Sequence, residues 1–89
     1  MKIKSGFVVR KIMDEFIVVP VGQRVTDFNG LITLNESGKF LWDILVAKDS
    51  TIEGLTDAML EEYEIDRTTA ELDVQKFVLI LRQQELIEA

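Results

Sequence analysis

The sequence predicts an α+β domain of the winged helix-turn-helix type, in which a three-stranded antiparallel sheet is followed by three helices. Residues 7–34 are rich in β-branched and aromatic residues, which favour strands. Residues 35–85 instead place apolar residues at helical spacing. The 89-residue chain has no Pro/Gly/Ser-rich linker and is long enough for one modest core, so we expect a single domain over residues 1–89.

The first two strands form a predicted hairpin. Val, Ile and Phe dominate residues 7–12 and 16–19, and such runs are typical of strands. The polar pair Asp14-Glu15 lies between them and is expected to form the turn. Pro20 should end the second strand, because it has no N–H to donate to the ladder.

A short third strand is predicted over residues 31–34, after a loop at residues 21–29 and the Asn29-Gly30 turn signal. In a simple meander this strand lies at the edge of the sheet. Edge strands are usually protected by charged residues or proline, and this one has neither. We therefore expect its backbone to pair with a dimer mate, the chain terminus or an extended peptide. In the last case, a proline at Ile32 should remove an edge donor and weaken binding.

Three helices are predicted from capping residues and apolar spacing. Asn35 is the expected N-cap of the first, and Asp66 that of the third, which runs to about Gln84. Ser50 followed by Glu53 indicates a capping box at the start of the second. The apolar faces of the first two helices contain Phe40, Leu41, Ile44 and Leu45, and Ile52, Leu55, Met59 and Tyr63.

The third predicted helix has apolar residues on two faces. The core face contains Ala70, Val74, Phe77, Val78 and Leu81. Leu72 and Leu79 lie on the opposite side, where they are either incidental exposed leucines or part of a partner or dimer surface. Leu86-Ile87 is expected to fold back onto the core.

The residue types available exclude most catalytic chemistry. The chain has no cysteine and no histidine, which removes disulfides, thiolate nucleophiles, the usual zinc sites and every Ser-His or Cys-His triad. The carboxylates at the end of the second helix are explained by a solvated surface. We therefore expect no catalytic residue, no metal and no cofactor.

The charge balance argues against polyanionic partners. The net charge of −6 repels phosphate backbones and acidic membranes. The predicted recognition helix, residues 67–85, carries equal numbers of basic and acidic residues, although its helix-turn-helix connectivity suggests DNA binding. No apolar run has the length of a signal or membrane segment, so the expected location is the cytoplasm.

The run NGLITLNESGKFLWDIL, residues 29–45, resembles the signature of the PqqD family. In that family a short strand ends in Leu-Asn and is followed by a Glu/Thr/Ser-Gly turn, an aromatic residue and a Trp-containing helix. The later run TIEGLTDAMLEEYEID and the closing Glu85-Leu86-Ile87 agree with the family pattern. The resemblance covers roughly residues 6–88.

The resemblance implies a non-catalytic peptide chaperone, also called a precursor recognition element, of ribosomally made and post-translationally modified peptide biosynthesis, of which PQQ biosynthesis is one case. Such a domain binds the leader of a precursor peptide by strand addition to residues 31–34 beside helix 67–84. It then presents the precursor to a modifying enzyme, often a radical SAM enzyme. Carried over by position, the peptide-binding residues are Leu31, Ile32, Thr33, Leu34, Asp73, Lys76, Phe77 and Ile80.

Within that set, Phe77 is expected to form the floor of the site rather than to contact the peptide directly. The resemblance does not specify the client peptide or the enzyme. The alternative functions are a winged-helix DNA-binding domain and a structural module that forms a homodimer through Leu72 and Leu79 or through the sheet edge.

Overall fold

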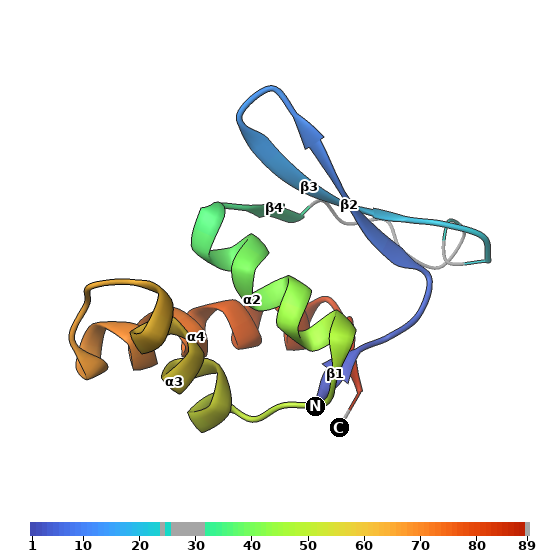
Figure 1. The fold of residues 1–89 in the computed structure, drawn as a ribbon. Helices are drawn as coiled ribbons and strands as arrows, with labels where there is room; N and C mark the ends of the chain where they lie inside the picture. The colour runs from blue at the N-terminus through green and yellow to red at the C-terminus, as the bar shows by residue number, and fades with distance from the viewer. Residues whose placement is uncertain (24, 26–31, 89) are drawn as a thin grey trace.

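The structure is a computed structural model that describes residues 1–23, 25 and 32–88. Leu31 and the expected Asn29-Gly30 turn lie outside the described residues. The elements are, in chain order (Figure 1), β1 (Lys2–Ile3), β2 (Phe7–Ile12), β3 (Glu15–Pro20), β4 (Ile32–Leu34), α2 (Glu36–Ala47), α3 (Ile52–Glu62), α4 (Arg67–Gln83) and β5 (Ile87–Glu88).

The main sheet is antiparallel with the strand order β2-β3-β4, so the predicted fold class is confirmed. Ile12 pairs with Glu15, which places the hairpin turn at Met13-Asp14, one residue earlier than predicted. Met13 has a φ of 57°, the left-handed conformation that tight hairpin turns require. Pro20 is the last residue of β3, as expected.

The N-cap residues of two helices, α2 and α4, were predicted correctly. The Asn35 carboxamide oxygen accepts a hydrogen bond from the Gly38 N–H at 2.8 Å and caps α2. Asp66 is the N-cap residue of α4, although its carboxylate accepts from the Thr69 hydroxyl rather than from a backbone N–H. This hydrogen bond is the main cause of a lowered Asp66 pKa.

The predicted capping box at the start of α3 is wrong. Thr51 is the N-cap, and its hydroxyl oxygen accepts from the Gly54 N–H at 3.0 Å. The Ser50 N–H donates a hydrogen bond to the Met1 carbonyl oxygen, and the Met1 amino group donates one to the Ser50 carbonyl oxygen, each at 2.9 Å. Ser50 therefore belongs to the segment that precedes α3. A tertiary contact with the start of the chain therefore overrides the local Ser-x-x-Glu pattern.

Two short strands were not predicted. β1 pairs with β5, which brings Lys2 opposite Glu88 and Ile3 opposite Ile87. Leu86 is fully buried, so the expected return of the chain end to the core is confirmed. The tail thus pairs with β1 and leaves β4 unoccupied by it.

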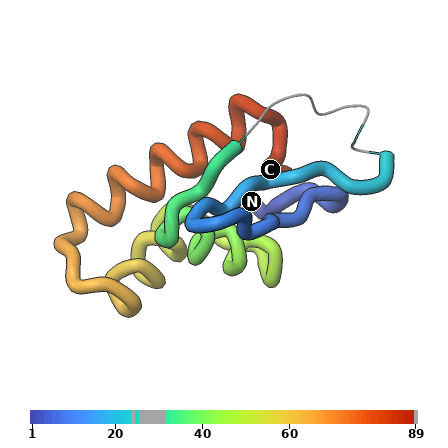
Figure 2. The backbone as a smooth tube through the Cα atoms, turned by 90° about the horizontal axis from the view of Figure 1, so that it is seen from above, coloured from blue at the N-terminus to red at the C-terminus, as the bar shows by residue number. Residues whose placement is uncertain are grey.

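A single apolar core joins the sheet to the helices. It contains Ile3, Val18, Ile32, Leu34, Leu41, Trp42, Leu45, Leu55, Met59, Ala70, Val74, Phe77, Val78, Leu81 and Leu86. In the view of Figure 2, β4 lies between the β2–β3 hairpin and α4. None of the helices in the described part of the chain has the length and hydropathy required to cross a bilayer.

Candidate functional site

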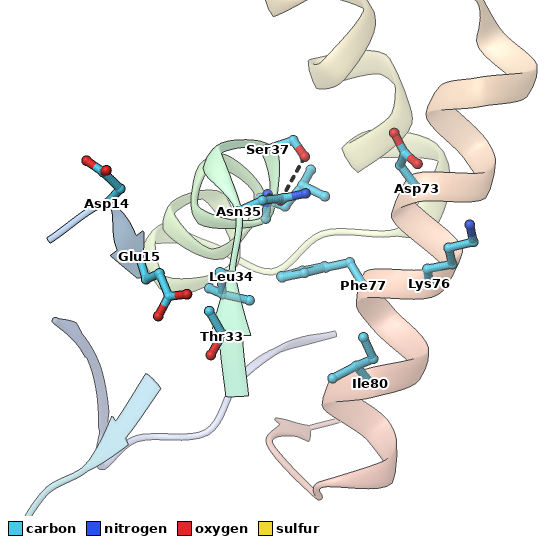
Figure 3. A pocket seen from close by; sticks show the side chains of 12 residues that line it. Asp14, Glu15, Thr33, Leu34, Asn35, Ser37, Asp73, Lys76, Phe77 and Ile80 are labelled. Carbon is cyan, nitrogen blue, oxygen red and sulfur yellow. Dashed lines mark hydrogen bonds between the residues drawn. The ribbon is translucent and has the colours of Figure 1, made fainter. Parts of the chain in front are cut away.

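A groove of about 490 Å³ opens between β4 and α4 (Figure 3). We call it the β4–α4 groove. Its lining comes from the hairpin turn, from β4, from the start of α2 and from one face of α4. The lining residues are Asp14, Glu15, Thr33, Leu34, Asn35, Ser37, Gly38, Leu41, Asp73, Lys76, Phe77 and Ile80.

β4 contributes the free edge of the sheet to this groove. It pairs only with β3 in the described chain, through Val18 with Ile32, Ile17 with Thr33 and Phe16 with Leu34. Its side chains alternate, because Ile32 and Leu34 are buried whereas Thr33 is exposed.

The register indicates which backbone groups of β4 face the groove. Hydrogen-bonded and non-hydrogen-bonded pairs alternate along an antiparallel ladder, and the pair that flanks a two-residue turn is hydrogen-bonded. Counting from Ile12 and Glu15, the backbone groups of Val18 point toward β4 and those of Ile17 toward β2. Ile32 and Leu34 therefore pair back to β3, and the N–H and C=O of Thr33 point away from β3.

The same register corrects the proposed proline test. A proline at Ile32 would remove a donor that faces β3, not a donor at the free edge. The Ile32 side chain is 4% exposed and belongs to the core, so Ile32 does not line the groove. Thr33 is the described residue of β4 whose backbone N–H is available at the edge.

α4 forms the opposite wall with four residues that share one face. Asp73, Lys76, Phe77 and Ile80 are spaced as helical neighbours and all line the groove. The Phe77 ring points from α4 toward Leu34 and is 7% exposed, so it forms the floor (Figure 3). Ile80 is 48% exposed and lies toward the Thr33 end.

The groove therefore brings together six of the eight residues named from the sequence: Thr33, Leu34, Asp73, Lys76, Phe77 and Ile80. Leu31 lies outside the described residues, and Ile32 packs in the core.

Sequence reasoning missed the remaining lining residues, for two different reasons. Asp14 and Glu15 were considered only as a turn. They reach the groove because the pairing of β3 with β4 places this turn beside the end of β4, and such a pairing between strands cannot be recognised from the residues near Asp14 in the sequence. Asn35, Ser37, Gly38 and Leu41 were interpreted as the first turn and the apolar face of a helix, and not as part of a peptide site. Their position directly after the edge strand was the signal that could have identified them.

Gly38 lets α2 approach β4 closely. A Cβ at this position would lie 3.2 Å from the Asn35 Oδ1 atom and 3.3 Å from the Leu34 Cβ atom. The Asn35 oxygen also accepts from the Ser37 hydroxyl at 3.0 Å, so this end of the groove is fixed by hydrogen bonds.

The charged groups of the groove have no partners within the described chain. Asp14, Glu15, Asp73 and Lys76 form no ion pair there. Among the described residues, no cluster of three or more acidic or other ligating side chains could hold a metal ion. The groove thus offers a strand edge, an apolar floor and uncompensated charges, an arrangement suited to binding an extended chain.

The second apolar face of α4 is also present. Leu72 and Leu79 are 52% and 55% exposed, and neither lines the groove. The cations of α4 do not form a basic surface, because Arg67 is paired with Asp57 at 2.6 Å and lies 3.7 Å from Glu71. The charge pattern therefore gives no support to a DNA-recognition helix.

Comparisons with known proteins agree with the resemblance seen in the sequence. A family model described as coenzyme PQQ synthesis protein D (PqqD) matches residues 9–87. A solved structure described as TbiB1 in complex with the TbiA(beta) leader peptide is 29% identical, with a TM-score of 0.75, and the match covers 100% of this chain and 96% of that chain. Comparison with curated protein sequences gave no match.

Proposed function

This chain belongs to the PqqD family, and on that premise we propose that it is a non-catalytic domain that recognises a precursor peptide. The peptide is the leader of a ribosomally synthesised precursor, and it binds as an added strand in the β4–α4 groove. The domain then presents the precursor to a modifying enzyme, of which a radical SAM enzyme is the class that the family resemblance implies. The proposed contact residues are Thr33, Leu34, Asp73, Lys76, Phe77 and Ile80.

The observation that carries this proposal is the outer edge of β4, which no strand of the described residues occupies, beside Phe77 and Ile80 of α4. Extended peptides commonly bind by adding a strand to such an edge, and pockets for alternate side chains give selectivity. The similarity to TbiB1, whose structure is described as a complex with the TbiA(beta) leader peptide, supports a leader peptide as the ligand. The chain's own tail does not compete for this edge, because it pairs with β1.

The size of the edge sets what the backbone can contribute. β4 has three residues, and each main-chain hydrogen bond is worth about 0.5–1.5 kcal/mol net. A side chain fully buried against Leu34, Leu41 and Phe77 would add about 1.5–3 kcal/mol. A micromolar dissociation constant corresponds to about 8 kcal/mol, so side chains in the groove must supply much of the affinity.

Chemical-shift mapping tests the proposal. Binders would first be selected from a displayed library of random linear peptides against the whole chain. We expect the selected peptide, titrated into isotopically labelled protein, to move the amide signals of residues 32–34 and 73–80. Shifts confined to the β1–β5 pair or to the outer face of α3 would contradict the proposal.

A further inference from the structure

We infer that the β4–α4 groove selects a peptide in which a lysine or arginine is adjacent to an apolar residue. This inference rests on the proposed function and adds the chemistry of the ligand to it. The groove is lined by three carboxylates, Asp14, Glu15 and Asp73, and by one cation, Lys76. Two negative charges are therefore in excess among the residues that line the groove.

What distinguishes these three carboxylates from other unpaired surface carboxylates of the described residues, such as Glu53 and Glu61, is their place in the groove lining. Asp43 is paired with Lys39 at 2.5 Å, and Asp57 with Arg67 at 2.6 Å. Within the described residues, Asp14, Glu15 and Asp73 have no such cation. A cationic side chain of the ligand would supply the charge that the protein does not.

The apolar and acidic parts of the groove are arranged for alternate side chains. Leu34 and Phe77 meet at its floor, whereas Glu15 lies beside β4 on the side away from α4 (Figure 3). Glu15 is two residues before Ile17, the partner of Thr33, so Glu15 and Thr33 face the same exposed side of the sheet.

Successive side chains of an added strand point to opposite faces. One side chain would therefore enter the space above Leu34 and Phe77. The next would lie beside Thr33 on the exposed face, within reach of Glu15 if it is as long as lysine or arginine. This places the apolar and basic residues of the ligand next to each other in sequence.

The peptide selection described above tests the inference directly. We expect the selected sequences to be enriched in lysine or arginine next to an apolar residue. Exposed ion pairs are weak, so Glu15→Lys and Asp73→Lys should each weaken binding of a selected peptide by about three- to tenfold at about 0.1 M salt, where the Debye length is about 10 Å. Exchanging the basic residue of the peptide for glutamate should restore binding to Glu15→Lys.

A matched control distinguishes the effect of charge in the groove from the effect of the net charge of the chain. Glu53→Lys makes the same change in net charge at an exposed first-turn residue of α3, which is not part of the groove lining. We expect it to change the affinity by less than about twofold, since exposed charges more than a Debye length apart are largely screened. An equal loss in Glu53→Lys and Glu15→Lys would overturn the inference.

The two proposals fail in distinguishable ways. Peptides that lose binding in Thr33→Pro but show no preference for basic residues, or a preference for acidic ones, would overturn the charge inference alone. Peptides that bind Thr33→Pro as tightly as the unchanged chain would overturn strand addition, and the charge inference with it. Thr33→Ala, which keeps the backbone N–H, controls for loss of the side chain.

Discussion

The two edges of the main sheet differ in length, in charge and in what lies beside them. β2 offers six residues at one edge and includes Arg10 and Lys11, whereas β4 offers three uncharged residues at the other. Charged residues are a common protection of an edge against further pairing. The longer edge is thus protected by its own sequence, and the shorter one is bordered by α4 and the β4–α4 groove. The comparison teaches that the β4 edge is distinguished by the helix beside it, not by its length.

The largest effect on stability is expected from removing Phe77, which forms the floor of the groove beside the β4 edge. Phe77→Ala should lower the free energy of unfolding by about 3–5 kcal/mol, because it deletes a buried aromatic ring. Urea denaturation would measure this loss. Ile80→Ala is the matched control on the same wall; since Ile80 is half exposed, its cost should be about 1 kcal/mol or less.

Phe77→Leu keeps an apolar floor and provides a folded variant for binding measurements. We expect it to weaken a groove-binding peptide while Lys11→Ala at the β2 edge leaves binding unchanged. Equal effects at the two edges would show that the helix confers no selectivity.

Proline substitutions compare the two edges directly. By the alternation of the ladder, the N–H groups of Thr33 and Lys11 both point outward, one at each edge. Thr33→Pro should weaken peptide binding about tenfold, the equivalent of one or two lost hydrogen bonds. Lys11→Pro should leave binding unchanged. Calorimetric titration would measure both, and circular dichroism would establish that each variant is folded.

A smaller effect is expected where α2 approaches β4. Gly38→Ala adds a methyl group 3.3 Å from the Leu34 Cβ atom, so Leu34 must shift by a few tenths of an ångström. Alanine also stabilises a helix by about 0.5–1 kcal/mol relative to glycine, so the net change in stability should be small. Peptide affinity should still fall several-fold, because Leu34 lines the groove. Unchanged affinity at unchanged stability would show that the position of Leu34 is not critical.

The smallest effect concerns pH at the start of α4. The Thr69 hydroxyl holds the pKa of Asp66 below its ordinary value of 3.8. A lowered pKa in the folded chain stabilises it above pH 3.8, and this contribution is lost as the pH falls through the lower folded value. Thr69→Val should return the Asp66 pKa toward 3.8, as carboxyl NMR titration would show. Because Asp66 is hydrogen-bonded to Thr69 of its own helix and neither residue lines the groove, signals of the β2–β3 hairpin should not follow this titration.

The sequence predicted the features that depend on local patterns. Runs of Val, Ile and Phe located β2 and β3, and Asn35 identified the start of α2 through a hydrogen bond within four residues. The resemblance to the PqqD family also directed attention to β4 and α4, which the structure places on opposite sides of one groove.

Features that depend on contacts between distant segments were not predictable in this way. β1 and β5 have two residues each, which is too short to show an alternation of apolar and polar residues in the sequence. They form because the fold brings Lys2 opposite Glu88. The capping box at Ser50 failed because Met1 binds the Ser50 backbone. The direction in which the Ile32 N–H points depends on the turn at Met13-Asp14. This turn joins β2 to β3 and so fixes which backbone groups of β3 face β4.

The pairing of β1 with β5 also has an engineering consequence. It places the two ends of the polypeptide side by side, away from β4 (Figure 1). A short flexible linker could join these ends, and new ends could be opened in the tip at Met13, whose side chain is 89% exposed. Such a circular permutant would retain β4 and α4 intact, so that a reporter could be fused next to the recognition surface instead of opposite it.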